Sequence, residues 1–553
     1  MVRVMLLNTH CYMQQNQAAK KAIHILGVIC LALASHAQAA SHLTLMSSGL
    51  TPQPKQLNTI YALNYSTLPL KKPLSELYQL RGYKLIWSDG NQYNDNAKQL
   101  LSSIQNASQF GLNPFDYDAE LIQSFLEATS IDEKLLSKSD IVFTHAYIKL
   151  AAHINNGKLD NIQTYLNNNN TLLMTLNKAA DSNSVSDVFN GLQPNHSPYK
   201  NLIKALDFYT KLDVKKETIT LTERSYEFGD RSIEIPKIRQ RLHQLGDLAA
   251  DDLTSELYDE SLMLGVSHFQ IRHGLEADGI LGKQTVRELN VPIWRRIQQL
   301  ELNLARAQSL PDISSGKHLL VNIPAYKLYL YDNQQLAYTS NVVVGKKKHK
   351  TPTISSELTK IILSPYWNVP RSITKNEIIP EIQKDPHYLT KNNMRLISTK
   401  LQHTRFIDPY TIDWANLNPS KIDFRVRQEP GQGNSLGNIK FIFPNRHSVY
   451  LHDTPARGLF ALPRRAFSHG CIRLEDPFGL AETLLSSSTG WSKYDLLNIS
   501  KQSKSKTLAL EEPVPIHLTY MTAWADDQGI VNFRPDIYNR DAQVLASLYN
   551  ASL

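Results

Sequence analysis

The spacing of apolar residues changes near residue 315, and this change limits the chain to folds that combine helical and sheet-forming parts. From Leu77 to about Thr210, apolar residues recur three and four positions apart, which is typical of helices with one buried face. From Leu319 onward, short runs rich in β-branched and aromatic residues are separated by turn residues such as Asp332-Asn333, which predicts strands. A chain of 553 residues is too long for one ordinary core. We therefore predict a multidomain α+β protein.

Composition adds a constraint on partners. Apolar residues make up 42% of the chain and charged residues 20%, which is typical of a folded globular protein. The net charge is +8 and the pI about 9.0, a basic excess that suits nucleic acid, an anionic membrane or an anionic cell-wall polymer. No zinc-finger, RNA-recognition or basic-zipper pattern occurs in the sequence, so we predict no nucleic-acid partner. A basic surface without a dedicated partner is the alternative.

The N-terminus has the pattern of a secretory signal peptide. The basic pair Lys20-Lys21 precedes an apolar run, Ile23 to Ala34, which is followed by the small-residue cleavage pattern Ala37-Gln38-Ala39. The run is shorter than the roughly 20 residues that a membrane-spanning helix needs. We predict that residues 1–39 are removed and that the mature protein is exported without an anchor; an uncleaved signal anchor is the alternative. Met13 is a second candidate for the start of the chain.

Two helical regions follow. Residues 40–230 are predicted to form a helical N-terminal scaffold domain. Residues 231–294 form a second unit, in which Pro236 suits the first turn of a helix and glycine turns delimit later helices. This unit resembles the three-helix peptidoglycan-binding domain through the phrases FQIRHGLEADGILG (269–282) and TVRELN (285–290). The resemblance implies attachment to peptidoglycan, and a helical spacer that has lost sugar binding is the alternative.

The strand-rich region, residues 315–505, contains one long interruption. Between about residues 371 and 437 the chain is charged, shows no clear strand alternation and ends in the glycine-rich stretch 428–437. An insertion of this length within a compact domain predicts a subdomain or an active-site lid. Residues 506–553 are predicted to form a C-terminal tail packed on the preceding domains, with a short strand over residues 516–519.

Cys471 is the residue that most directly indicates chemistry. The other two cysteines, Cys11 and Cys30, lie in the predicted signal peptide, so the mature chain would hold one thiol and no intramolecular disulfide. A thiol needs a nearby base or cation to become an effective nucleophile. His452, at the end of a predicted strand, is the predicted base, because His469 lies only two residues before the cysteine on a tight turn.

The residues around Cys471 resemble the L,D-transpeptidases, whose signature is a His, a spacer, Ser/Thr-His-Gly-Cys, a hydrophobic residue and Asn. Here His452, fifteen intervening residues, Ser468-His469-Gly470-Cys471 and Ile472 match, while Arg473 stands in the place of Asn. The resemblance implies a mainly-β YkuD-type catalytic domain. Three further phrases are similar to those of the large, lid-bearing Gram-negative members: WNVP (367–370), QEPGQGNSLGNIKF (428–441) and HLTYMTAW (517–524).

The resemblance also implies a role for each matching residue. It makes Cys471 the nucleophile and His452 its general base, with the carbonyl group of Asp453 orienting the imidazole. The residues expected to support the loop and the oxyanion hole, together with the amide of Cys471, are Gly470, His469 and Tyr450. The residues expected to contact the substrate are Arg473, Ser468, Arg464, Arg465 and Trp367. Surface arginines without a ligand are the alternative for the three arginines.

The implied reaction is a two-step acyl exchange in peptidoglycan. Cys471 would attack the carbonyl between meso-diaminopimelate and D-Ala of a tetrapeptide stem, release D-Ala and pass the acyl group to the diaminopimelate amine of a second stem, giving a 3→3 crosslink. The expected location is the periplasm, and the expected partners are stem peptides and glycan, with penicillin-binding proteins as further candidates. Carbapenems are expected to acylate Cys471. No cofactor or metal is predicted.

Four other interpretations stay open at this point. A zinc site could use His452, His469 and Cys471, although no fourth ligand or close pair of cysteines is evident. A cysteine peptidase could pass the same acyl-enzyme to water. A wall-binding scaffold without activity would follow if the lid blocks Cys471. Finally, Cys471 could be a small buried hydrophobic residue.

Overall fold

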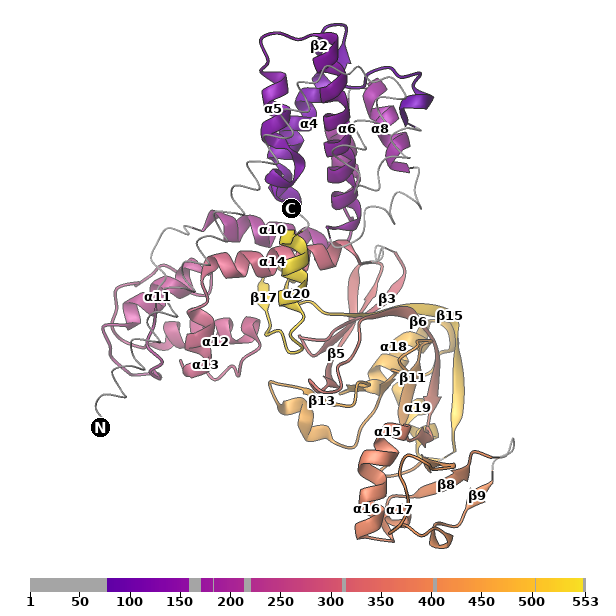
Figure 1. Cartoon of the computed structure of the whole chain (residues 1–553). Helices are drawn as coiled ribbons and strands as arrows, with labels where there is room; N and C mark the ends of the chain where they lie inside the picture. The colour runs from indigo at the N-terminus through magenta and orange to yellow at the C-terminus, as the bar shows by residue number, and fades with distance from the viewer. Residues whose placement is uncertain are drawn as a thin grey trace, which may run out of the picture. The chain divides into compact units, whose positions relative to one another are not determined.

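The computed structural model describes residues 77–158, 171–182, 184–212, 220–310, 315–400, 405–502 and 504–550. The chain divides into two compact units, residues 1–193 and 194–553, coloured along the chain in Figure 1. The predicted signal peptide, with Cys11 and Cys30, lies outside the described residues. Among the residues that are described, no helix combines the length and apolar character needed to span a membrane.

The first unit is helical, as predicted. Its helices are α4 (Asp95–Gln105), α5 (Ala119–Leu126), α6 (Glu133–Asn156), α8 (Thr171–Ser182) and α9 (Val185–Gly191). Helix α6 forms the centre, since nearly all of its residues from Leu136 to Ile154 are buried. Its buried Asp140 accepts hydrogen bonds of 2.8 Å from the backbone amides of both Ile86 and Trp87, which ties the segment before α4 to the core.

The second unit begins with a helix that the sequence assigned to the first. Helix α10 (Ser197–Lys211) shares a core with α14 (Ile293–Gln308) and strand β16 (Ala523–Ala525). The structure thus groups this helix with later segments of the chain, while the domain boundary at residue 230 stays a prediction. Helical periodicity identifies the apolar face of α10, but it carries no information about which distant segment covers that face.

The predicted binding unit is formed by α11 (Ile235–Gln244), α12 (Glu260–His273) and α13 (Lys283–Leu289), which enclose their own apolar cluster. Asp259 caps α12 through the amide of Leu262, and Gly274 ends it in the left-handed conformation. The side chain of Gln270 then holds the following turn, donating to the carbonyl oxygen of Ile280 at 2.9 Å and accepting from the amide of Gly279 at 2.9 Å. These contacts explain the spacing of glycines in this unit.

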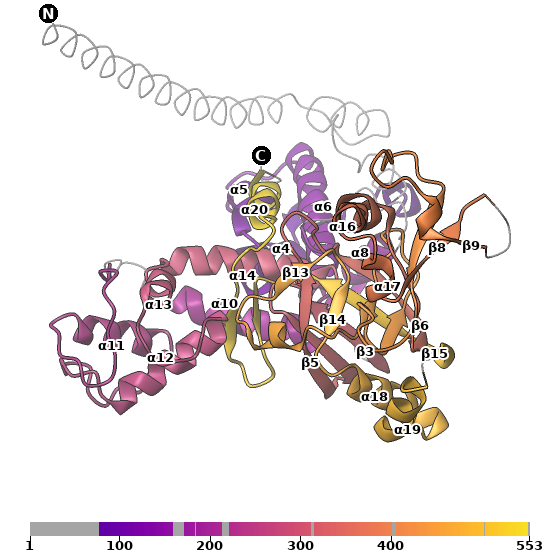
Figure 2. The same ribbon diagram turned by 90° about the horizontal axis from the view of Figure 1, so that it is seen from below.

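The predicted catalytic region is built on a large mixed sheet. Within the described residues its nine strands are β3 (Lys317–Asn322), β4 (Lys327–Asp332), β5 (Gln335–Gly345), β6 (Ile354–Leu363), β11 (Ile439–Ile442), β12 (Leu451–His452), β13 (Ala466–Ser468), β14 (Ile472–Leu474) and β15 (Lys506–Thr519). Their order is β13-β5-β14-β12-β11-β6-β15-β3-β4, and β4 also pairs with β5, which closes the sheet on itself. Figure 2 shows β5 and β14 close to β13. Helices α18 (Pro477–Thr489) and α19 (Lys493–Ser500) pack against the sheet.

Strand β15 corrects the prediction of a C-terminal tail beginning at residue 506. Its residues pair with β6 along most of its length and in parallel with β3 over residues 516–519, so it is an interior strand of the sheet. Pro513 and Pro515 obscured this strand in the sequence. They lie at and next to a register shift, before the segment that pairs with β3, where a missing N–H costs no bond to that strand.

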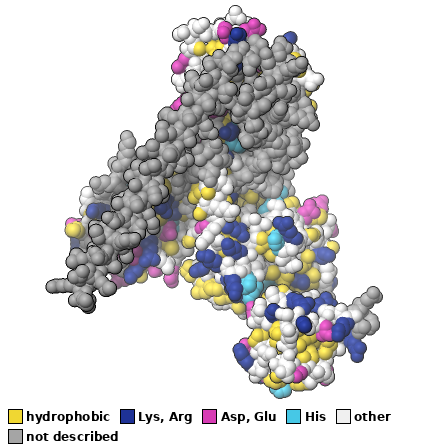
Figure 3. All heavy atoms as spheres, in the orientation of Figure 1, with side chains coloured by type: hydrophobic (Ala, Val, Ile, Leu, Met, Phe, Trp, Pro, Cys, Tyr) yellow, Lys and Arg dark blue, Asp and Glu magenta, His cyan; other side chains and the backbone are white. Residues whose placement is uncertain are grey.

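The insertion between β6 and β11 is a subdomain with its own core, which we call the lid. Its elements are β7 (Trp367–Asn368), α15 (Arg371–Ile373), η3 (Thr374–Ile378), α16 (Ile379–Lys384), α17 (Tyr388–Lys391), β8 (Met394–Ser398), β9 (Phe406–Ile407) and β10 (Phe424–Gln428). The strands, absent from the prediction, pair in the order β7-β10-β8-β9. They are too short for alternation to stand out in the sequence. Lys and Arg side chains gather on the visible face of the lid and of the adjoining sheet domain (Figure 3).

Candidate active site

Parallel pairing between two short strands brings the predicted catalytic residues together. Leu451 of β12 faces Ile472 of β14, and both side chains are fully buried in the core of the sheet domain. Because side chains alternate along a strand, the residues on either side of this pair project to the opposite face. The side chains on that face that line one cavity of about 500 Å³ are Tyr450, His452, Cys471 and Arg473.

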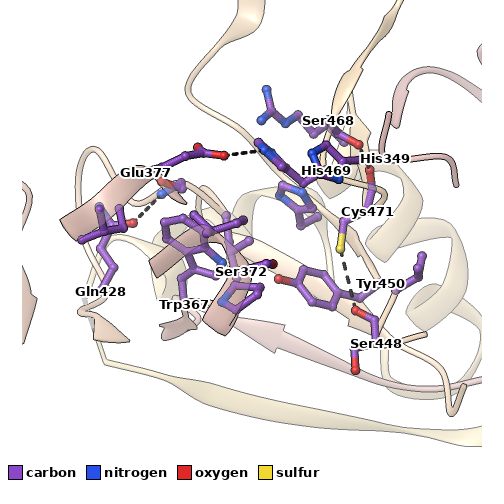
Figure 4. Close-up of a pocket in the computed structure, with 18 of the residues that line it drawn as sticks. His349, Trp367, Ser372, Glu377, Gln428, Ser448, Tyr450, Ser468, His469 and Cys471 are labelled. Carbon is purple, nitrogen blue, oxygen red and sulfur yellow. Dashed lines mark hydrogen bonds and ion pairs between the residues drawn. The ribbon is translucent and has the colours of Figure 1, made fainter. Parts of the chain in front are cut away.

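The residue Cys471 lines this cavity, and its sulfur is 3.8 Å from the carbonyl oxygen of Ser448 (Figure 4). Burial raises the pKa of the thiol, while hydrogen bonding from Tyr450 and the positive charges of Lys440 and Arg473 act in the opposite direction. Desolvation is the largest of these effects. The resting cysteine is therefore a protonated thiol that needs a base to remove its proton.

His452 has the properties of such a base. Its Nδ1 lies 2.5 Å from the carbonyl oxygen of Asp453, which is the contact expected from the sequence. Burial, followed by the charge of Arg473, lowers the pKa of the imidazole to about 3, so the ring is neutral near pH 7. Within the described part of the chain, no hydrogen bond joins this ring to the thiol of Cys471. Proton transfer therefore requires the two side chains to approach during the reaction.

The turn before the cysteine differs from the prediction in one respect. The amide of Gly470, expected to face an oxyanion, donates to the Oγ of Ser468 at 3.0 Å, and that hydroxyl donates to the carbonyl oxygen of Cys471 at 2.5 Å. Ser468 is 2% exposed, so it supports the turn and does not offer its hydroxyl to a substrate. The amide of Cys471 has no acceptor among the described residues and is the remaining candidate for the oxyanion hole.

His469 points away from the thiol, toward the lid. Its Nε2 lies 2.7 Å from Oε1 of Glu377 in η3, and its ring is 4.8 Å from the ring of His349 (Figure 4). Neither Glu377 nor His349 was predicted. Glu377 lies 94 residues before Cys471 within the insertion, and His349 lies in the β5–β6 loop. No motif in the sequence links either residue to the cysteine.

Comparison with known proteins finds family matches for three regions of the chain. Residues 316–502 match the L,D-transpeptidase catalytic domain, residues 72–206 the Scaffold domain, and residues 231–289 the "Putative peptidoglycan binding domain". A Haemophilus influenzae protein named "Putative L,D-transpeptidase" is 35% identical over 275 residues, which is 49% of this chain and 54% of that protein. The chain carries an L,D-transpeptidase catalytic domain. The match to the curated relative spans only about half of that relative's length.

Two solved structures are also similar to this chain. The L,D-transpeptidase of Xylanimonas cellulosilytica is 14% identical, with 54% of this chain and 99% of that chain covered and a TM-score of 0.18. The L,D-transpeptidase of Stackebrandtia nassauensis is 11% identical, with 54% and 96% covered and a TM-score of 0.22. The domain assignment depends on the family matches and the Haemophilus influenzae relative.

The remaining predicted substrate residues of the L,D-transpeptidase domain divide into two groups. Arg473 and Trp367 line the cavity, and the buried Nε of Arg473 has no hydrogen-bond partner among the described residues. Arg464 and Arg465 do not line it. Arg465 donates to the carbonyl oxygen of Leu462 at 2.9 Å and lies over the ring of Tyr326, so its contacts are structural.

Tyr450 lies beside the nucleophile, as its position in the sequence suggested. Burial, and secondly the nearby Cys471, raise the pKa of its phenol, so it stays a neutral hydroxyl. Its ring meets the His452 imidazole edge-on at 5.7 Å, and Nζ of Lys440 lies 5.4 Å from the ring centre. Among the described residues, no group of three or more His, Cys, Asp or Glu side chains is placed to hold a metal ion.

Proposed function

We propose that this protein forms 3→3 crosslinks in peptidoglycan through a thioester on Cys471. The observation that carries the proposal is the placement of Cys471, His452 and Arg473 on one face of two paired strands, within one cavity of an L,D-transpeptidase catalytic domain. The thiol is the nucleophile that a stable acyl-enzyme requires, and the neutral imidazole is a base matched to it.

In the first step, His452 takes the proton of the Cys471 thiol and the thiolate attacks the carbonyl carbon between meso-diaminopimelate and D-Ala. The carbonyl oxygen becomes an oxyanion, and the amide of Cys471 donates a hydrogen bond to it. The C–N bond then breaks, His452 returns the proton to the amine of D-Ala, and D-Ala leaves. The Asp453 carbonyl keeps the imidazole in the tautomer that accepts at Nε2.

Arg473 is the residue suited to hold the donor stem. Among the described residues that line the cavity it carries the only guanidinium group, and its buried Nε lacks a partner. Stem peptides carry carboxylates, and a guanidinium group binds a carboxylate through paired hydrogen bonds. Arg473 thus serves the donor in a position where the family signature has Asn.

In the second step, the amine of an acceptor stem attacks the thioester, so that a C–N bond forms and the C–S bond breaks. The same acyl-enzyme could pass to water, which would make the protein a peptidase. The lid side of the cavity, with Trp367, Ile373 and Tyr388, favours transfer because it surrounds the thioester with protein and limits the access of water.

The other domains suggest where this chemistry takes place. The match of residues 231–289 to a peptidoglycan-binding domain supports attachment of the enzyme to the wall, and the signal pattern in residues 1–39 supports export to the periplasm. We propose separately that penicillin-binding proteins deliver substrate to the enzyme. Co-purification of crosslinked complexes from the periplasm tests this proposal.

Product analysis with a defined disaccharide-tetrapeptide tests the function. The wild-type enzyme is expected to release D-Ala and form 3→3 dimers, and Cys471→Ala is expected to do neither. A carbapenem should add one covalent adduct to the wild type and none to Cys471→Ala, measured by intact-protein mass spectrometry. D-Ala release without dimers would instead identify a peptidase. Dimers formed by Cys471→Ala would refute the assignment of the nucleophile.

A further inference from the structure

A contact between Glu377 and His469 joins the lid to the catalytic loop at one side of the cavity. Glu377 Oε1 lies 2.7 Å from Nε2 of His469, two residues before the nucleophile (Figure 4). Glu377 carries the only carboxylate among the described residues that line the cavity. About half of its side chain is exposed, so a ligand can reach it. None of the steps assigned above uses this pair.

The backbone explains why Glu377 is directed to this position. It lies in η3, a π-helical turn in which the amide of Ile379 bonds to the carbonyl oxygen of Thr374, five residues earlier. Pro380 follows and has no N–H to offer to the carbonyl of residue 376, so a regular α-helical turn cannot form there. Such π turns frequently occur at functional sites because they rotate side chains relative to a regular helix.

A positive group lies beside the same imidazole. Nζ of Lys346 is 3.4 Å from Nε2 of His469. The backbone of Lys346 is held in place, because its amide donates to the carbonyl oxygen of Ser468 at 2.9 Å and its own carbonyl accepts from the amide of His349 at 2.7 Å. Gly345 permits this tight loop, since a Cβ atom there would lie 2.0 Å from the carbonyl oxygen of His349.

A carboxylate and an ammonium group thus contact the same nitrogen of His469, two residues before the nucleophile. This arrangement is complementary to a ligand that carries an ammonium and a carboxylate on one carbon atom. We propose that Glu377, His469 and Lys346 bind the zwitterionic amino-acid head of the acceptor, its ammonium against Glu377 and its carboxylate against Lys346. The inference rests on the proposed function, because the side chain of meso-diaminopimelate ends in such a head.

The subsite holds the attacking nitrogen next to the thioester. On transfer, the ammonium first gives one proton to water, and the nitrogen lone pair attacks the thioester carbonyl carbon. The C–N bond forms, the C–S bond breaks with its electrons on sulfur, and the second proton passes by way of His452 to restore the thiol. An amine without a neighbouring carboxylate can react in the same way, but it lacks the contact with Lys346.

Two variants and two acceptors test the subsite in the full-length enzyme. Glu377→Gln is expected to release D-Ala from a tetrapeptide donor within about twofold of wild type, while KM for a diaminopimelate acceptor rises about tenfold or more, the usual effect of losing a charge-assisted hydrogen bond. Lys346→Met is expected to raise KM for that acceptor equally, but to leave KM unchanged for the same stem with lysine in place of diaminopimelate. When Glu377→Gln and Lys346→Met are each combined with Cys471→Ala, calorimetry should show the same differences in Kd for the two acceptors.

A matched control distinguishes binding from lid stability. Glu381→Gln removes an exposed carboxylate one turn further along the lid, where it pairs with Lys384, and should change neither step. Unchanged KM and Kd for the acceptor in Glu377→Gln would overturn the subsite. Equal losses in the donor and acceptor steps would also overturn it, because they would show that Glu377 only stabilises the lid. If the wild type releases no D-Ala and gains no acyl mass, the proposed function itself is refuted and the subsite falls with it.

Discussion

The neutral state of His452 leads to a prediction about the pH dependence of stability. The ring is 4% exposed, and burial together with the charge of Arg473 lowers its pKa from 6.5 to about 3. Because 6.5 − 3 = 3.5, the folded state disfavours protonation by about 5 kcal/mol at low pH. The unfolded chain binds this proton first, so this contribution to stability is fully present above pH 6.5 and is lost as the pH falls to about 3.

The size of this change in the free energy of unfolding, over a pH range in which the protein can be studied, follows from the two pKa values of His452. Between pH 7 and pH 5, protonation of the unfolded chain at this residue should lower the free energy of unfolding by about 2 kcal/mol. His452→Asn keeps a donor for the Asp453 carbonyl but does not titrate. The loss of stability between pH 7 and pH 5 should therefore be about 2 kcal/mol smaller in this variant than in wild type.

Two measurements check this prediction. Urea unfolding of wild type and His452→Asn at pH 7 and pH 5, followed by a signal from the sheet domain, gives the difference directly, and subtraction removes the contributions of other histidines. NMR of the enzyme with labelled histidine should show that the resonance absent from His452→Asn does not titrate above pH 5. A midpoint near 6.5, or an equal pH dependence in both proteins, would refute the view that burial keeps this base neutral.

Three further predictions concern residues of the sheet domain that support the site. Leu451→Ala opens a cavity behind His452 and should lower the free energy of unfolding by about 2–5 kcal/mol in urea titrations, with a smaller loss for Leu451→Ile. Ser468→Ala removes the hydroxyl that holds the turn, so acylation of Cys471 by a carbapenem should slow about tenfold in stopped-flow measurements, and Ser468→Thr should retain the rate. Deletion of residues 506–553 removes an interior strand and should leave no protein that a carbapenem can acylate; a soluble, acylated product would contradict the observed sheet.

The sequence was sufficient for the parts of the site that depend on neighbouring residues. The strand that ends at His452 and the glycine-containing turn before Cys471 are local patterns, and both recur in the structure. The contact between the His452 ring and the Asp453 carbonyl also joins adjacent residues. The order of the scaffold, binding and catalytic domains could be predicted because the helical periodicity of the first and the short family motifs of the other two are local features of the sequence.

Only the tertiary structure determined which distant segments meet. It placed β15 inside the sheet, joined α10 to α14, and turned the Gly470 amide toward Ser468, away from an oxyanion. It also brought Glu377 of the lid to His469. The physical reason is that an apolar face or an unpaired backbone group indicates that a partner is needed, but many segments of the chain can supply one. The closure of the whole sheet and the packing of its connections determine which segment does so.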